Sequence, residues 1–303
     1  MAKEIYLARY MHIISRLEKG PASFEQIRDY LEQASEIDGR DYSISIRTLQ
    51  RDIRDIYSQL NIEITNDKKG DRCYRIVDRN ETIGFGARML ESYQIIHAIN
   101  TSYDFQDVVF LENRQPKGLE HFHSLLHAIR NKRVTEIIHQ KYSDTESTTR
   151  IIHPLALKEA LGRWYIIAID TRDNKLKTFG LDRISDVFVQ KTRYREKYDI
   201  NLRDKYRESF GILTHDKLKI QQVILRFSYE QGQYVKTYPL HNSQRVIKED
   251  KQYVLIELNI YVTYDFLKEL LSFGHELQVI EPLSLKQDIQ KIMQKALEQY
   301  KQK

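Results

Sequence analysis

Arginine and glutamine side chains recur along one short stretch, residues 43–60, at spacings that could bring them to one face of a helix. The stretch begins Ser-Ile-Ser-Ile-Arg-Thr-Leu-Gln-Arg-Asp. Arg can hold guanine through two hydrogen bonds and Gln can hold adenine in the same way, while further Arg side chains bind phosphates. These residues suit a helix that enters the major groove of DNA, although a solvated basic face on an ordinary helix would give the same pattern. The candidate DNA contacts here are Ser45, Arg47, Thr48, Gln50, Arg51 and Arg54.

An apolar stripe predicts the helix that would carry these side chains. Apolar residues recur at spacings of three and four, which corresponds to one face of an α-helix, and Ser45 can cap the first turn. The stripe consists of Ile46, Leu49, Ile53, Ile56 and Leu60. The basic residues fall on a second stripe, rotated away from the apolar one.

Two further helices are predicted ahead of this stretch. Apolar residues from Ile5 to Leu17 recur at helical spacing, and the run stops at Gly-Pro, residues 20–21, a pair that breaks helices. Ser23 and Gln26 stand three residues apart, which predicts a capping box at the start of the second helix. Three helices are therefore expected within the first 60 residues.

A β-hairpin is predicted after the basic helix. Residues 62–64 and 73–76 have strand character and flank the polar turn Asn-Asp-Lys-Lys-Gly, residues 66–70. Lys68 and Lys69 in this turn are further candidate DNA contacts. Helix, helix, basic helix and hairpin is the order of a winged helix-turn-helix, in which the third helix enters the major groove and the hairpin touches the DNA backbone.

The sequence SIRTLQRDI, with the hairpin that follows it, resembles the DNA-binding half of bacterial transcription regulators of the DeoR type. This resemblance implies that double-stranded operator DNA is a partner. One departure is the stretch from Ala34 to Ser43, which is longer than the usual turn between the second and third helices. It leaves the start of the recognition helix open by a few residues.

Composition is consistent with a modular protein of a reducing compartment. A chain of 303 residues predicts two or three domains, because single cores rarely grow past about 250 residues. The formal charge of +5 permits nucleic-acid binding without requiring it. The single cysteine, Cys73, excludes an intramolecular disulfide and a zinc site of several thiolates. No apolar run approaches the roughly 20 residues of a membrane span and no signal peptide is evident, so we expect a cytoplasmic protein without membrane contact.

The middle of the chain changes from helical to strand periodicity. Five short runs separated by turn residues are expected to form a small, partly closed antiparallel barrel. They span residues 134–142, 149–154, 163–170, 175–179 and 184–189. The segments GRWYIIAID and KTFGLDRISDV, preceded by IIHPLALK, resemble the WYL domain, with Ile166 in the third motif position. The resemblance implies a small Sm-like five-stranded β-barrel that senses a nucleotide or nucleic acid.

Polar side chains alternate with apolar neighbours in these strands, so several could point to one side of the sheet. Grouped guanidinium, ammonium, imidazole and phenol side chains suit an anion, for example the phosphate of a nucleotide or oligonucleotide. The candidate effector-binding residues are Arg150, His153, Tyr165, Lys177 and Arg183. In WYL proteins the matching positions form a basic ligand pocket, and Lys177 stands where the family often has Arg. Core packing is the preferred role of Trp164, and Asp182 could pair with and orient Arg183.

Residues 79–133 have helical spacing and are expected to connect the DNA-binding and sensing domains. His123 and His127 lie four apart, as metal ligands on one helical face can, and His121 is nearby. The zinc-protease pattern needs Glu after its first His, and this chain has Ser124 there. A polar helix face is the favoured interpretation, so no metal or other cofactor is expected.

The last third predicts a separate α+β domain, residues 217–303, after a linker at 196–216. LLSFGHELQVIEP in this domain resembles the C-terminal extension that accompanies many WYL domains, which implies dimer contacts and effector gating. The expected fold class is multi-domain α+β. It consists of a winged helix-turn-helix at 1–78, a helical linker at 79–133, the WYL barrel at 134–195 and this extension.

The predicted function is that of a sequence-specific transcription regulator. We expect a homodimeric repressor, acting on its own gene, whose operator binding responds to an anionic nucleotide or nucleic-acid effector. Catalysis is not expected, because Gly-x-Ser-x-Gly and Walker motifs are absent and GFGARM at Gly84 lacks the third Gly and the strand of a dinucleotide site. Two alternatives stay open: a WYL-type activator, and a sequence-independent single-strand binder that uses aromatics such as Tyr165 and Phe179.

Overall fold

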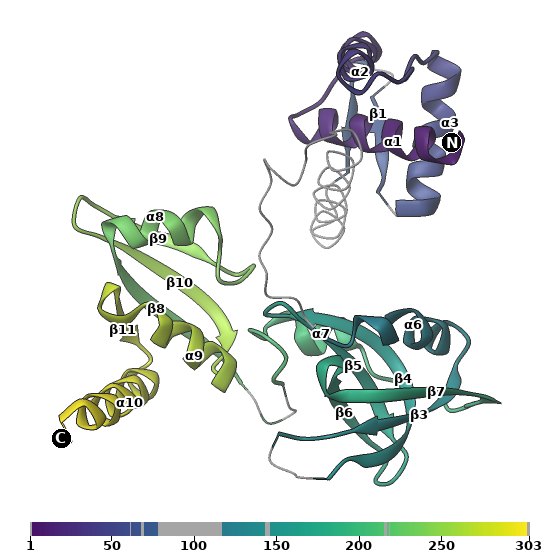
Figure 1. Ribbon diagram of the computed structural model, residues 1–303. Helices are drawn as coiled ribbons and strands as arrows, with labels where there is room; N and C mark the ends of the chain where they lie inside the picture. Colours follow the sequence, from purple (N-terminus) through teal and green to yellow (C-terminus); the bar gives the residue numbers. More distant parts are fainter. Residues whose placement is uncertain are drawn as a thin grey trace. The chain divides into compact units, whose positions relative to one another are not determined.

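The computed structural model describes residues 2–60, 62–67, 70–77, 117–142, 146–214, 217 and 219–301 (Figure 1). The chain divides into two compact units, residues 1–113 and 114–303. The described part has mixed α+β structure, with helices and three antiparallel sheets. No helix of this part is long and apolar enough to cross a membrane.

The first unit contains three helices followed by a two-stranded sheet. The helices are α1 (Ala2–Glu18), α2 (Phe24–Asp38) and α3 (Ile46–Leu60), and the strands are β1 (Ile64–Asn66) and β2 (Tyr74–Ile76). The strands pair antiparallel. The apolar faces of the helices and strands meet in one core, to which each helix contributes buried side chains. These include Ile13, Ile14, Ile27, Leu31, Leu49 and Ile56.

The capping box at the start of α2 is confirmed. The backbone N–H of Gln26 donates to Ser23 Oγ at 3.3 Å, and the N–H of Ser23 donates to Gln26 Oε1 at 2.9 Å. The helix ends at Gly39, whose φ of +64° favours glycine. Because α2 continues to Asp38, the connection to α3 is shorter than the sequence suggested.

The start of α3 agrees with the predicted cap but not with the predicted apolar stripe. Ser45 Oγ accepts a hydrogen bond from the N–H of Thr48 at 3.1 Å, as an N-cap does. Leu49, Ile56 and Leu60 are buried, whereas Ile46 is 53 % exposed. The expectation for Ile46 was therefore wrong, because this residue occupies the first turn of α3, ahead of the part that packs on the core.

A buried ion pair joins α1 to α3. The Arg9 guanidinium donates twice to Asp52, with Nε 2.7 Å from Oδ2 and Nη2 3.0 Å from Oδ1. Arg9 is 5 % exposed and Asp52 is fully buried. Two parallel charge-assisted hydrogen bonds fix the orientation as well as the contact. This pair holds the buried side of α3 against α1.

We expect Asp52→Ala to destabilise the first unit by about 3–5 kcal/mol, because it leaves the Arg9 guanidinium buried without its counter-charge. Hydrogen exchange of α1 and α3 amides in the full chain measures this loss. The matched control is Asp29→Ala, since Asp29 pairs with Arg28 on the exposed surface and should change stability by less than about 1 kcal/mol. Additive losses for Asp52→Ala and Arg9→Ala in the double variant would contradict a direct pair.

The second unit begins with a five-stranded antiparallel sheet of order β6-β5-β4-β3-β7. Its strands are β3 (Arg133–His139), β4 (Thr148–Ala160), β5 (Arg163–Asp170), β6 (Lys175–Gly180) and β7 (Ile184–Arg193). Within the described residues β6 does not pair with β7, so these strands form an open sheet. The expected closure into a barrel is not observed.

The strands overlap the predicted runs, but β3 ends three residues earlier, and β4 and β7 continue six and four residues further. The predicted run ended at Pro154, a residue that lacks the N–H donor of a paired strand. The structure accommodates it at a register shift between Pro154 and Ala156 in the pairing with β5. Leu161 and Gly162, both with positive φ, then make the tight turn into β5.

Helix α6 (Phe122–Arg130), after the short 3-10 helix η1 (Leu119–His121), packs on this sheet. From the sequence these residues are expected in the helical linker, yet Leu125 is fully buried in the sheet's core. Trp164 is partly buried against the same core and meets the Phe122 ring edge to face, with 4.8 Å between ring centroids. Core packing of Trp164 agrees with this contact.

The chain then continues through α7 (Leu202–Arg207) into a four-stranded sheet of order β11-β8-β10-β9. The backbone N–H groups of Ile212 and Leu213 donate to Asp265 Oδ2 at 3.0 and 3.2 Å, which ties the connection to α9. The remaining elements are β8 (Ile220–Ser228), α8 (Tyr229–Thr237), β9 (Arg245–Glu249), β10 (Tyr253–Tyr261), α9 (Tyr264–Ser272), η3 (Gly274–Glu276), β11 (Leu277–Glu281) and α10 (Leu283–Lys301).

Candidate functional site

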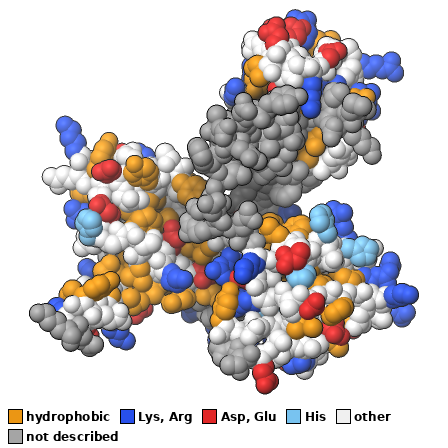
Figure 2. All heavy atoms as spheres, in the orientation of Figure 1, with side chains coloured by type: hydrophobic (Ala, Val, Ile, Leu, Met, Phe, Trp, Pro, Cys, Tyr) orange, Lys and Arg blue, Asp and Glu red, His pale blue; other side chains and the backbone are white. Residues whose placement is uncertain are grey.

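The side of α3 opposite the core presents the basic residues to solvent. Arg47, Gln50, Arg51 and Arg54 are exposed, as is the capping Ser45, while Thr48 is half-buried. Arg51 Nε lies 3.8 Å from Asp52, and its guanidinium lies 5.8 Å from the centre of the Tyr6 ring. Figure 2 shows Lys and Arg side chains projecting from this unit.

The hairpin after α3 is fixed to the start of α2. Tyr74 and Ala22 exchange backbone hydrogen bonds of 2.7 and 3.0 Å, so β2 continues its pairing beyond β1. The buried Tyr74 side chain joins the helical core. Lys68 and Lys69, predicted in the turn of this hairpin, lie outside the described residues.

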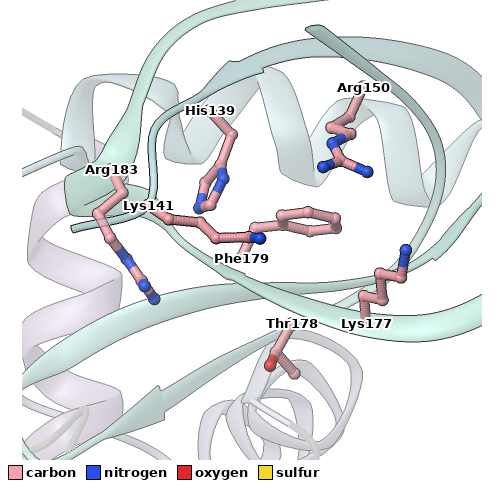
Figure 3. Close-up of a pocket in the computed structure, with 7 residues that line it drawn as sticks. All are labelled: His139, Lys141, Arg150, Lys177, Thr178, Phe179 and Arg183. Atoms are coloured by element: carbon pink, nitrogen blue, oxygen red, sulfur yellow. The ribbon is translucent and has the colours of Figure 1, made fainter. Parts of the chain in front are cut away.

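The five-stranded sheet carries a basic pocket of about 430 Å³ (Figure 3). Arg150 and Lys177 approach it from one side and Arg183 from the other, with His139 and Lys141 between them. Among the predicted effector residues, these are the three that the structure brings together. The lining, called the basic pocket below, consists of His139, Lys141, Arg150, Lys177, Thr178, Phe179 and Arg183.

Strand register explains which side chains meet. Arg150 is paired with Ile137 and Lys177 with Ala168, and these two apolar partners are buried in the core of the sheet. Directly paired residues share a face, so the basic pocket continues the face that also forms the core. His139 follows Ile137 by two residues and therefore lies on the same face.

A buried carboxylate holds the two cations on β4 and β6. Asp170 is fully buried and accepts hydrogen bonds from Arg150 Nη1 at 3.1 Å and Lys177 Nζ at 2.8 Å. Burial would raise the pKa of Asp170, but the hydrogen bonds from Lys177 and the Arg172 backbone N–H hold it below its usual value. Asp170 therefore stays ionised at neutral pH between the two cations. A second carboxylate, that of Asp173, lies 2.8 Å from Lys177 Nζ on the more exposed side.

His139 is buried in the pocket and carries an unused polar atom. It is 5 % exposed, and its Nε2 has no hydrogen-bond partner among the described residues. Burial lowers the pKa of His139 to about 4, and the nearby Arg183, Arg150 and Lys141 charges add to this effect. The imidazole is thus neutral at pH 7, and an anion would remove part of the repulsion that keeps it so.

His153 and Tyr165 do not line the basic pocket. His153 lies three residues from Arg150 along β4, an odd spacing that turns it to the other face. There its Nδ1 lies 2.5 Å from Tyr198 Oη, and its ring stacks on Tyr194. Tyr165 is paired with Lys158 and is half-buried, and burial raises its pKa.

Sequence reasoning missed four lining residues. His139 and Lys141 follow the run Thr-Glu-Ile-Ile in β3, and Thr178 and Phe179 lie beside Lys177 in β6. His139 could have been identified from the sequence, because it lies two residues after the apolar Ile137 and therefore on the same face of the strand. The sequence does not show which strands are neighbours. This information was needed because the lining residues come from β3, β4 and β6 and from the segments next to them.

Asp182 pairs mainly with Arg163 rather than with Arg183. Arg163 Nη1 donates to Asp182 Oδ2 at 2.7 Å, whereas Arg183 Nε lies 3.7 Å from Oδ1. Tyr142 also donates to this carboxylate, and the Arg183 guanidinium lies 5.3 Å from the centre of its ring. Arg183 is therefore held at the edge of the basic pocket by weaker, longer contacts.

The histidines around α6 have local contacts. His121 Nε2 lies 3.1 Å from the carbonyl oxygen of Ile184, and Asn131 donates to the His127 backbone carbonyl. Within the described ranges, no three His, Cys, Asp or Glu residues are grouped as metal ligands would be.

Comparison with known families assigns two parts of the chain. Residues 120–189 match the WYL domain family. Residues 219–297 match the WCX domain family. We call these parts the WYL segment and the WCX segment. The basic pocket lies in the WYL segment, and the second antiparallel sheet lies in the WCX segment.

Two solved structures resemble the chain at low identity. One is proteasome accessory factor B/C (PafBC) of Arthrobacter aurescens, at 17 % identity and a TM-score of 0.31, over 95 % of this chain and 46 % of that one. The other is a CRISPR Cas-related protein, at 10 % identity and a TM-score of 0.39, over 99 % of this chain and 85 % of that one. The chain thus spans less than half the length of the PafBC chain. A search of the curated proteins found no match.

The basic pocket of the WYL segment can hold an anion by charge and hydrogen bonding. Arg guanidinium and Lys ammonium groups bind phosphate and carboxylate oxygens strongly, and a protonated His139 would add one more donor. Phe179 is 5 % exposed and packs against His139, with ring centroids 5.2 Å apart. The pocket therefore offers charge and donors rather than an open aromatic surface.

We expect the affinity of the full chain for sulfate to rise as the pH falls from about 8 to about 5, because a bound dianion raises the pKa of His139 and so takes up a proton. The gain begins as the pH falls through the raised pKa and is complete below about 4, where the ring of the free pocket is also protonated. Sulfate is the probe because it does not titrate in this range. Calorimetry at several pH values measures the effect.

His139→Asn should flatten this pH dependence. The exposed His127 offers the control, and His127→Asn should leave the dependence unchanged. An equal slope in the His139 variant and in the wild type would show that the proton is taken up elsewhere.

Proposed function

We propose that the chain is a sequence-selective DNA-binding transcription regulator whose binding is modulated by an anionic effector. In this proposal α3 reads operator DNA, and the basic pocket binds a nucleotide or nucleic-acid effector. The regulator is a homodimer and represses, its own gene included. It acts by binding and does not catalyse a reaction.

The observation that carries the proposal is the two-sided character of α3. One side is fixed by Leu49, Ile56 and the Asp52–Arg9 pair, and the other exposes three Arg side chains and Gln50. A rigid helix with planar hydrogen-bonding groups on its free side is what base reading in the major groove needs. The helix order and the hairpin after α3 support a winged helix-turn-helix. The matches to the WYL and WCX domains support a sensing half.

Two physical arguments support a dimer and a switch. One recognition helix reads few base pairs, so a two-fold pair of half-sites multiplies the discrimination. An effector that favours one arrangement of the dimer would change the spacing of the two helices. Such coupling is typically worth about 1–3 kcal/mol, which changes the affinity for DNA by about 5–150-fold.

Arg47→Ala should weaken binding to the DNA upstream of the chain's own gene by about tenfold or more, since a lost bidentate base contact costs about 1–3 kcal/mol. Fluorescence anisotropy against a scrambled duplex at physiological salt measures this loss. Arg28→Ala is the control, because Arg28 is exposed on α2 and pairs there with Asp29 and Glu32. If the Arg47 variant kept the wild-type preference for the upstream duplex, the proposal that α3 reads bases through Arg47 would be wrong.

Arg183→Ala should leave DNA affinity unchanged and reduce the response to effector. The measurement is the same titration with nucleotides and short single-stranded DNA as competitors. Arg245→Ala is the control, because Arg245 is a highly exposed residue of the WCX segment. Equal release of DNA from the Arg183 variant and the wild type would place the effector outside the basic pocket.

The same titration separates repression from the alternatives. Equal binding to upstream and scrambled duplexes, with tighter binding to single strands, would favour a sequence-independent single-strand binder. Selective duplex binding that strengthens with effector would favour a regulator that acts with its effector, as an activator can.

A further inference from the structure

A second concave basic surface lies in the same sheet, outside the basic pocket. It is a depression of about 530 Å³ formed where α6 ends, β3 begins and β7 ends. Figure 2 shows Lys and Arg side chains at the edge of the second unit where, in the same orientation, Figure 1 places the end of β7. Its lining, called the turn surface below, consists of Arg130, Asn131, Lys132, Thr192, Arg193, Tyr194 and Arg195.

The turn surface is concentrated in positive charge. Residues 130–133 and 191–195 contain three Lys or Arg each and no Asp or Glu. The next acidic residue along the chain, Glu196, lies 4.0 Å from His153 Nδ1. In the described part of the chain, none of the four cations that line the depression has an ion-pair partner. The helix dipole favours a cation at the C-terminal end of α6, which explains the position of Arg130. It does not explain Arg193, which ends β7, or Arg195, which follows it.

The backbone beneath these cations is held in place. Tyr194 N–H donates to the Lys132 carbonyl at 3.0 Å, and Tyr194 Oη donates to the Pro154 carbonyl at 2.7 Å. The Tyr194 ring is buried and stacks on His153, with centroids 4.5 Å apart. Lys132 has a φ of +48°, a conformation that is unfavourable for lysine and that the hydrogen bond from Tyr194 helps to hold. The cations thus project from a fixed frame.

The turn surface is separate from the basic pocket. Arg133 begins β3 and His139 ends it, so the two sites lie at opposite ends of this strand, about 20 Å apart at about 3.3 Å per residue. Strand β7 repeats the relation, since Arg183 immediately precedes it and Arg193 ends it. A ligand the size of a nucleotide in the basic pocket therefore leaves the turn surface accessible.

We propose that the turn surface binds the phosphodiester backbone of nucleic acid and so adds a contact beyond α3 and the basic pocket. Backbone contacts come from Arg and Lys together with hydroxyl side chains, and Thr192 is exposed here among the cations. The one aromatic ring of the depression is buried, so bases would find no surface to stack on. The surface would therefore bind without regard to sequence.

The test compares two triple variants of the full chain that remove equal formal charge. Arg130→Gln, Arg193→Gln and Arg195→Gln remove three of the four cations of the turn surface. Lys291→Gln, Lys295→Gln and Lys301→Gln remove three exposed cations from α10. Probes are a scrambled duplex of about 30 base pairs and a single strand of about 30 nucleotides, each titrated over a range of salt concentrations.

We expect the turn-surface variant to bind more weakly and to reduce the slope of log affinity against log salt by about 2–3 for duplex, since each neutralised phosphate contributes about 0.9. A loss confined to the single strand, at about 0.7 per phosphate, would identify that form as the ligand. The α10 variant should retain the wild-type slope. Equal slopes in the two variants would overturn the proposal, because the effect would then be one of net charge. An unchanged circular dichroism spectrum and melting profile exclude misfolding as the cause.

The result is independent of the function of α3. The same comparison is repeated in a background with Arg47→Ala and Arg51→Ala. The turn surface should contribute the same slope there, because its contacts do not read bases. If the α3 changes alone leave all DNA binding intact, the proposed reading by α3 fails while the turn-surface result still stands. If only the α3 changes matter, the turn surface is not a nucleic-acid contact.

Discussion

The basic pocket depends on one buried carboxylate. Arg150 and Lys177 lie on different strands, and two cations side by side repel each other unless a counter-charge is shared between them. Asp170, on the strand between, accepts a hydrogen bond from each and from the backbone of Arg172. Its ionised state keeps both cations in place, and the residues that line the pocket include four Lys and Arg side chains. The site is in this way prepared for an anion before any anion arrives.

The first unit also contains a buried carboxylate that accepts hydrogen bonds from a cation, but this carboxylate has a different structural role. Asp52 is as buried as Asp170, but its partner Arg9 is buried too, so this pair is neutral and closed to solvent. It orients α3, whose cations on the opposite side of the helix are exposed to solvent. A buried carboxylate in the WYL segment therefore supports a charged site, and one in the first unit supports the helix that presents charged residues.

Local patterns predicted the elements well where one face of each element is apolar. The capping box of α2 and the Ser45 cap of α3 need only neighbouring residues, so the sequence sufficed for both. The stripe failed at Ile46, since the first turn of α3 lies beyond the reach of the core. Strand β4 continues past Pro154, where the predicted run ended, because a register shift in its pairing with β5 accommodates the proline. This shift depends on the neighbouring strand and not on local sequence.

The sequence by itself determined which residue types are available: the basic stripe of α3, the cations of the WYL segment and the alternation of its strands. Alternation alone already separates Arg150 from His153, since odd spacing along a strand reverses the face. Only the tertiary structure decided that His139 joins Arg150 and Lys177, that Asp170 holds them, and that the strands form an open sheet. The physical reason is that a site built across strands depends on strand order and register, and these are set by contacts between residues far apart in the chain.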